Sequence, residues 1–206
     1  MNNKAIDKKE LIQRFRTEGI LDAARKVIAQ RGLDKTTMEQ VAEEAGISKA
    51  TIYLYFKNKD GLYYHCVISR FDEILEAMKA AVAGIDDPVK RLEVLIHTQV
   101  KDIESDKDFF KVLLTERSVL LLDKENELSQ EFAIRHKEFS GLIIDALKDG
   151  IASGVLRPID PTKGFYMLSS MVRGMAVCKL IAGEGGSFSS EADLILDVFW
   201  RGLKKS

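Results

Sequence analysis

The residues best suited to chemistry in this chain are hydroxyl, aromatic and lysine side chains clustered between Ser48 and Lys59. No aspartate or glutamate interrupts this stretch, whereas a solvated helix face normally carries both charge signs. Lysine and hydroxyl groups donate hydrogen bonds to phosphates, and apolar side chains contact base edges. The stretch therefore predicts a surface that contacts nucleic acid.

Two short helices joined by a tight turn are expected to position these side chains. Thr36 is predicted to cap the first helix, with Glu39 completing a capping box. Gly46 suits the turn because glycine adopts a positive φ at little cost. Ser48 is predicted to cap the second helix.

The spacing of apolar residues divides the second helix into an inner and an outer face. Ile52 and Phe56 fall on the face that packs inward, which leaves Ala50 and Leu54 at the centre of the outer face. A helix, a glycine turn and a second helix with a non-acidic outer face are typical of a helix-turn-helix. Such a motif places its second helix in the major groove of DNA.

The segment GISKATIYLYFKNKDGL resembles the signature of TetR-family transcriptional repressors, and the resemblance covers roughly residues 14–65. It implies that Lys49, Thr51 and Tyr53 meet bases or phosphates, and that Lys59 meets a phosphate. Leu54 either contacts a thymine methyl group or is a single exposed leucine. The residues expected to bind DNA are Thr36, Thr37, Lys49, Ala50, Thr51, Tyr53, Leu54, Tyr55, Lys57 and Lys59.

The composition is that of an ordinary globular protein of 206 residues with a net charge of −1. Through Leu62 the chain has 12 lysines and arginines against 9 aspartates and glutamates, so the part predicted to contact DNA is the more basic one. No apolar leader opens the chain, and no apolar run approaches the length of a bilayer span. A cytoplasmic location is expected.

The rest of the chain shows helical periodicity without strand-like alternation, so we predict an all-α fold of about nine helices. Residues 1–62 are expected to form a three-helix DNA-binding domain that includes the start of the fourth helix. Residues 63–206 are expected to form a larger ligand-binding and dimerisation domain. In this domain we predict helices over residues 109–122 and 126–153, and a last helix that opens at Ser190.

Aromatic, methionine and polar side chains in the second domain are candidates for a ligand cavity, although each is also compatible with an ordinary core or surface position. The candidates are His97, Phe110, Arg117, Phe132, His136, Phe139, Met167 and Met171.

The segment DLILDVFWRGL resembles the final helix of the TetR family, in which the last two long helices of each subunit form a four-helix dimer interface. The residues expected at that interface are Met175, Leu194, Val198, Phe199 and Gly202.

The sequence lacks the usual motifs of metalloenzymes, nucleotide-binding loops and serine hydrolases, so we predict no enzymatic activity, metal or cofactor. We expect a homodimeric repressor that binds a palindromic double-stranded operator and is released by a small, largely apolar effector. One alternative is an all-helical small-molecule binding protein or enzyme with a vestigial helix-turn-helix. Another is a transcriptional activator of the same fold.

Overall fold

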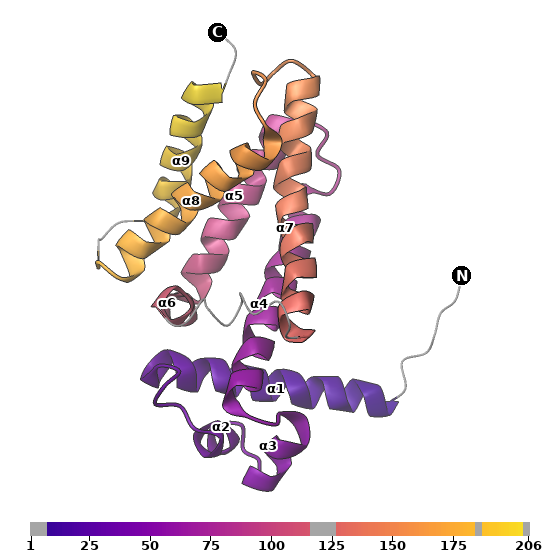
Figure 1. Ribbon diagram of the computed structural model, residues 1–206, viewed down its shortest axis with the longest axis vertical. Helices are drawn as coiled ribbons and strands as arrows, with labels where there is room; N and C mark the ends of the chain where they lie inside the picture. The colour runs from indigo at the N-terminus through magenta and orange to yellow at the C-terminus, as the bar shows by residue number, and fades with distance from the viewer. Residues whose placement is uncertain (1–7, 116–126, 184–186, 204–206) are drawn as a thin grey trace.

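The computed structural model describes residues 8–115, 127–183 and 187–203, and within these ranges the chain forms nine α-helices and no β-strand (Figure 1). The all-α prediction is confirmed. The helices are α1 (Lys8–Arg31), α2 (Met38–Glu44), α3 (Lys49–Tyr55), α4 (Lys59–Val82), α5 (Pro88–Ser105), α6 (Lys107–Thr115), α7 (Glu127–Ala152), α8 (Pro161–Leu180) and α9 (Phe188–Leu203). None of these helices combines the length and apolarity that a bilayer span requires.

The first three helices form a compact unit at one end of an elongated molecule, with α1 lying across the unit above α2 and α3 (Figure 1). Ala24, Val41 and Ile52, one from each helix, are fully buried and belong to one apolar cluster, which we call the lower core. As predicted, Ile52 and Phe56 point inward, and Gly46 adopts a positive φ of 66° in the turn.

The capping box of α2 is shifted by one residue from the predicted position. Thr37 is the N-cap and Gln40 the reciprocal partner, so the prediction of Thr36 and Glu39 is wrong. The physical reason is that Thr36 is already engaged: its buried hydroxyl donates to the Gly32 carbonyl, 2.8 Å away, at the end of α1.

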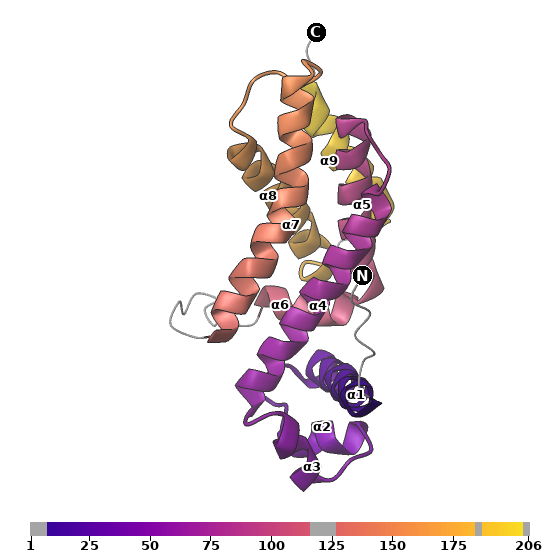
Figure 2. The same cartoon turned by 90° about the vertical axis from the view of Figure 1, so that its right-hand side faces the viewer.

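Helix α4 leaves the lower unit and rises into a bundle formed with α5, α7, α8 and α9 (Figure 2). Asn58 caps α4 as its side chain accepts from the Gly61 amide at 2.7 Å. Two Asp-Pro pairs, at 87–88 and 160–161, cap and open α5 and α8, because proline lacks the N–H that a first helical turn leaves unpaired. We call the second apolar cluster, centred on the bundle, the upper core.

Helix α6 lies between the bundle and α1 (Figure 1), and it contributes to the lower core although it follows α5 in the chain. Phe109 and Val112 of α6 are buried in that cluster, together with Cys66 and Val67 of α4. The two cores are therefore joined through α4 and α6.

Three predicted helix bounds differ from the structure. Helix α7 ends at Ala152 rather than at residue 153. Helix α6 begins at Lys107 rather than at residue 109, and its predicted extension to residue 122 falls outside the described residues. Helix α9 begins at Phe188 rather than at Ser190. Phe188 is buried against the upper core, which extends the helix toward its N-terminus.

Candidate nucleic-acid interface and cavity

The outer face of α3 is free of neighbouring elements at the end of the molecule (Figure 1). Leu54 is 83% exposed and Tyr53 is 44% exposed, and Ala50 lies exposed beside them. The helix begins at Ser48, whose side chain accepts from the Thr51 amide at 3.1 Å. The same serine hydroxyl lies 2.8 Å from the Thr51 hydroxyl, so Thr51 sits at the half-exposed edge of this face.

The three lysines predicted to contact DNA have different surroundings. Lys57 is exposed, whereas Lys49 forms an ion pair with Glu39 of α2. The Lys59 ammonium donates to the backbone carbonyls of Leu33 (2.8 Å) and Asp34 (3.1 Å), in the turn that follows α1. Lys59 therefore ties the start of α4 to the α1–α2 connection.

The remaining predicted DNA contacts are also placed unequally. Thr36 is only 2% exposed and its hydroxyl serves the Gly32 carbonyl, so it is not available at the surface. Thr37 is exposed at the start of α2. Tyr55 is half-buried and packs against the lower core.

Comparisons with known proteins agree with this geometry. Residues 20–66 match the family described as "Bacterial regulatory proteins, tetR family", and residues 85–177 match "Tetracyclin repressor-like, C-terminal domain". The uncharacterized HTH-type transcriptional regulator YhgD of Bacillus subtilis (strain 168) is 30% identical over 171 residues, which are 80% of each chain. The chain belongs to the TetR family. It is a transcriptional regulator, as are its relatives, and not an enzyme.

The chain is also similar to two other regulators and to one solved structure. The fatty acid metabolism regulator protein of B. subtilis (strain 168) is 27% identical over 138 residues, covering 67% of this chain and 69% of that one. The structure of FadR from B. subtilis in complex with stearoyl-CoA shares the fold, with a TM-score of 0.77 at 22% identity over 88% of this chain and 96% of that one. Against the B. subtilis regulator YerO, at 30% identity, the chain spans about half of the relative's length (52%).

The described residues of this TetR-family regulator enclose a cavity of about 70 Å³ between α4, α5, α6 and α7. Most of its wall is apolar, and Arg70, Gln99 and Asp102 are polar residues in it. A cavity of this volume is well below the ~300–1,000 Å³ typical of drug-sized ligand sites. The apolar wall includes Val67, Phe71, Ile74, Ile103, Phe110 and Phe139.

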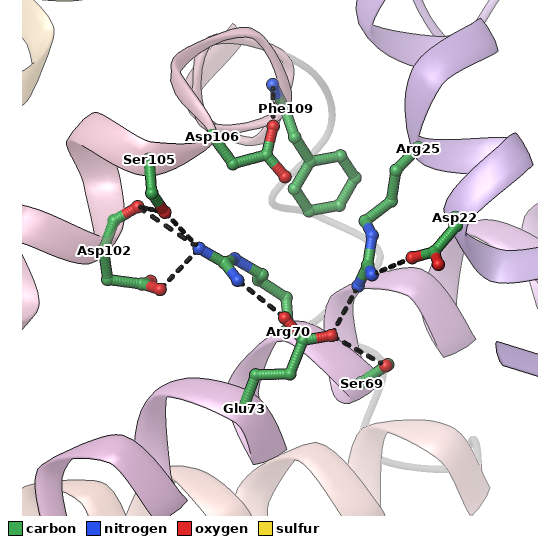
Figure 3. Close-up of polar contacts among 9 residues, drawn as sticks. All are labelled: Asp22, Arg25, Ser69, Arg70, Glu73, Asp102, Ser105, Asp106 and Phe109. Carbon is green, nitrogen blue, oxygen red and sulfur yellow. Dashed lines mark hydrogen bonds and ion pairs between the residues drawn. The ribbon is translucent and has the colours of Figure 1, made fainter.

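A polar network borders the cavity and extends to α1 (Figure 3). Arg70 donates to Glu73 at 2.6 Å and to the Ser105 hydroxyl at 3.0 Å. It also pairs with the Asp102 carboxylate and donates to the Asp102 backbone carbonyl at 3.2 Å. Glu73 accepts a second hydrogen bond, at 2.9 Å, from Arg25 of α1. The network thus connects α1, α4 and the end of α5.

Adjacent side chains of α6 also connect the cavity with the lower core. Phe109 is fully buried in the lower core and reaches the cavity wall. In the view of Figure 3 its ring hangs from α6 toward the guanidinium groups. Phe110 lines the cavity, and its ring centroid lies 6.0 Å from the Arg70 guanidinium carbon.

Some predicted ligand residues lie at or near the cavity. Phe110 and Phe139 are in its wall. Phe132 and His136 lie beside the wall: the Phe132 ring packs edge-on against Phe71, with centroids 4.7 Å apart. The His136 ring lies 6.0 Å from that of Phe132, and burial lowers the pKa of His136.

The other predicted ligand residues are not brought to the cavity. His97 faces outward from α5, with its Nε2 3.2 Å from Asp193 of α9. Met167 is 61% exposed on α8, and Met171 is half-buried against the upper core. Arg117 lies outside the described residues. The helical spacing of apolar residues along one helix does not show whether a given face borders a cavity or is exposed to solvent.

The residues predicted for the dimer interface fall into two groups. Leu194 and Val198 are 57% and 52% exposed on one face of α9, and Gly202 is exposed near its end. Met175 of α8 is half-buried, whereas Phe199 is 5% exposed and packs within its own subunit against the upper core.

The sequence interpretation did not single out Arg70, Gln99 and Asp102. A signal for Arg70 was present, because Val67, Phe71 and Ile74 form an apolar stripe on α4 and Arg70 lies at helical spacing within it. A charged residue inside an apolar stripe indicates a polar group in a cavity or core. Gln99 and Asp102 carried no comparable signal.

Proposed function

We propose that this TetR-family regulator is a cytoplasmic, ligand-responsive repressor that binds a palindromic operator as a homodimer and is released from DNA by a small, largely apolar effector. The proposal assigns DNA binding to residues 1–62, and ligand binding and dimerisation to residues 63–206. The observation that carries it is the exposed, non-acidic face of α3 at one end of the molecule, in a three-helix unit whose α1 is connected through the polar network to an apolar cavity.

The exposed α3 face supports direct readout of DNA. Leu54 and Ala50 offer apolar contacts to thymine methyl groups, and the Tyr53 and Thr51 hydroxyls offer hydrogen bonds to bases or phosphates. Lys57 and Lys49 would meet phosphates, and Lys49 would first exchange its partner Glu39 for DNA.

The exposed apolar residues of α8 and α9 support a dimer. Leu194, Val198 and Val177 are large apolar side chains exposed on adjacent helices, and such clusters mark interaction surfaces. A two-fold dimer would present two α3 helices to half-sites about 34 Å apart, one turn of the duplex. Gly202 would let a neighbouring helix approach closely.

The cavity and the polar network support release by an effector. The cavity must expand to hold a ligand of ordinary size, and expansion would displace Arg70 or Phe110 from its wall. Displacement of Arg70 would disturb its bond to Glu73 and thereby Arg25 of α1. An effector shifts the equilibrium only if it binds better to the conformation that fits DNA poorly, and DNA must weaken effector binding by the same factor.

Relatives support an effector with an apolar body. One relative is a regulator of fatty acid metabolism, and the FadR structure contains stearoyl-CoA, which carries a long apolar chain. The mostly apolar wall of the cavity suits a similar body here.

The proposal is tested by fluorescence anisotropy with DNA from upstream of the protein's own gene, at several salt concentrations. We expect saturable, salt-dependent binding of one dimer per palindrome, and lower transcription from that promoter in a reconstituted assay. An increase in transcription would indicate an activator instead. Absence of sequence-specific binding would contradict the proposed function.

A further inference from the structure

Two polar atoms of the cavity residues are unpaired. The Nε of Arg70, from α4, and the Oε1 of Gln99, from α5, are buried and have no hydrogen-bond partner among the described residues. Both side chains line the same cavity. Buried polar atoms in native proteins are nearly always hydrogen-bonded, so this pair indicates a group that belongs in the cavity. One atom is a donor and the other an acceptor, so that group must both accept and donate.

The charges around Arg70 disfavour an anionic group. Its guanidinium already faces two carboxylates, since Nη1 binds Glu73 and Nη2 pairs with Asp102. A third negative charge would be repelled by both carboxylates at close range. A cationic ammonium group would donate to Gln99 but would leave the Arg70 Nε without an acceptor.

The rest of the cavity requires an apolar body. The polar residues are surrounded by the apolar side chains of Phe71, Ile74, Ile103 and Phe139. These side chains form no hydrogen bonds with water, so a ligand body rich in carbon can contact them without losing any. The volume of about 70 Å³ equals that of roughly two water molecules in the liquid. It accommodates a small head group, and the body would enter as the aromatic wall moves aside.

We propose that the cavity binds an uncharged molecule with an apolar body and one head group that both accepts and donates a hydrogen bond, such as a hydroxyl or a primary amide, held between Arg70 and Gln99. This inference rests on the proposed function, because it names the chemical class of the effector.

Isothermal titration calorimetry of the full-length protein at pH 7 tests the proposal with four probes of equal chain length: 1-hexanol, hexanamide, hexanoate and hexylammonium. We expect the two uncharged probes to bind one per chain, at least about tenfold more tightly than the two ions. Replacing Gln99 by leucine keeps a similar volume and removes the acceptor. Gln99→Leu should weaken the binding of hexanamide about tenfold. Thr98→Val, on the same helix but outside the cavity wall, should leave both hexanamide affinity and operator affinity unchanged.

Three results would each overturn this assignment. They are tighter binding of hexanoate than of hexanamide, equal affinity of Gln99→Leu and the unmodified protein for hexanamide, and binding of none of the four probes. The proposed function would survive any of these results if another ligand, such as an acyl thioester, released the protein from its operator. A protein that binds no operator would instead contradict the proposed function itself, whatever the probes do.

Discussion

Arg25 of α1 and Arg70 of α4 donate to different oxygens of the same Glu73 carboxylate, with N–O distances of 2.9 Å and 2.6 Å (Figure 3). Burial alone would raise the pKa of Glu73, but hydrogen bonds from Arg70 and Arg25 lower it below its ordinary value. Glu73 is therefore held ionised between two cations. One cation lies on α1, in the unit formed by the first three helices, and the other lies in the cavity wall, so a change at the cavity can reach α1 through one side chain.

Arg25→Gln should reduce the coupling between effector and operator. The substitution removes the cation that connects Glu73 to α1, so we expect the effector-induced loss of operator affinity to shrink by about 1 kcal/mol, or about fivefold. The measurement is operator affinity with and without saturating effector. Arg135→Gln is the matched control, because Arg135 pairs with Asp72 between α7 and α4 without reaching α1. If the effector lowers operator affinity by the same factor in both variants and in the unmodified protein, the Glu73–Arg25 contact does not couple the cavity to α1.

Tyr53→Ala and Leu54→Ala should alter discrimination between operators, whereas Lys57→Ala should weaken binding to all sequences. A lost base contact costs about 1–3 kcal/mol at the matching site and little elsewhere. Loss of a phosphate contact should lower the salt slope of log K by about one per half-site. Anisotropy titrations with operator and single-base variants at three salt concentrations separate the two. If both kinds of substitution leave operator affinity unchanged, the exposed face of α3 is not the surface that contacts DNA.

Lys59→Met should destabilise the fold, unlike Lys57→Met. The Lys59 ammonium satisfies the carbonyls of Leu33 and Asp34, and loss of these bonds is expected to cost about 1–3 kcal/mol of unfolding free energy. Urea unfolding followed by circular dichroism measures the difference. A loss of DNA affinity without a loss of stability would show that Lys59 acts mainly on phosphate, as the family resemblance implies.

Asp102→Asn should remove part of the pH dependence of stability. Burial raises the pKa of Asp102 to about 6 from its ordinary value of 3.8, against the attraction of Arg70. Between these values the folded protein holds a proton that the unfolded chain has released. The unfolding free energy therefore falls as pH rises through this window, by at most ~3 kcal/mol, and this contribution is constant above it. Urea unfolding from pH 4 to 7 measures this effect. The unfolding free energy of Asp102→Asn should fall less with rising pH than that of the unmodified protein.

The control for that experiment is Asp145→Asn on α7, whose carboxylate is 65% exposed. Its pH profile should follow that of the unmodified protein. If the unfolding free energy of Asp102→Asn also varies with pH as in the unmodified protein, then Asp102 ionises as readily in the folded protein as in the unfolded chain.

Val198→Glu should convert a dimer into monomers and weaken operator binding. Val198 is 52% exposed on α9, and a charge buried in an apolar interface costs several kcal/mol. Sedimentation velocity measures the change in mass, and anisotropy measures the loss of affinity. Ile134→Glu on α7, where Ile134 is 60% exposed, tests whether any added surface charge has this effect. A monomeric unmodified protein would contradict the proposed dimer.

Short-range patterns in the sequence predicted much of the fold and of the α3 surface. The cap at Ser48, the glycine turn at Gly46 and the inward position of Ile52 each depend on residues a few positions apart. Local hydrogen bonds and helical periodicity decide such features, so the printed sequence contains the information. The exposed position of Leu54 follows from the same periodicity.

Tertiary packing decided which functional side chains meet. The Lys59 ammonium meets the carbonyls of Leu33 and Asp34, which precede α2 and α3 in the chain, and Arg70 joins α1 to the end of α5 through Glu73. Phe109 enters the lower core although it follows α5. These contacts depend on how the helices cross and on which faces they bury, and periodicity along one helix gives only the direction of a side chain, not the element opposite it. The sequence by itself therefore determined an all-α protein in which one face of α3 points outward, while the cavity and its connection to α1 arose only from packing between distant segments.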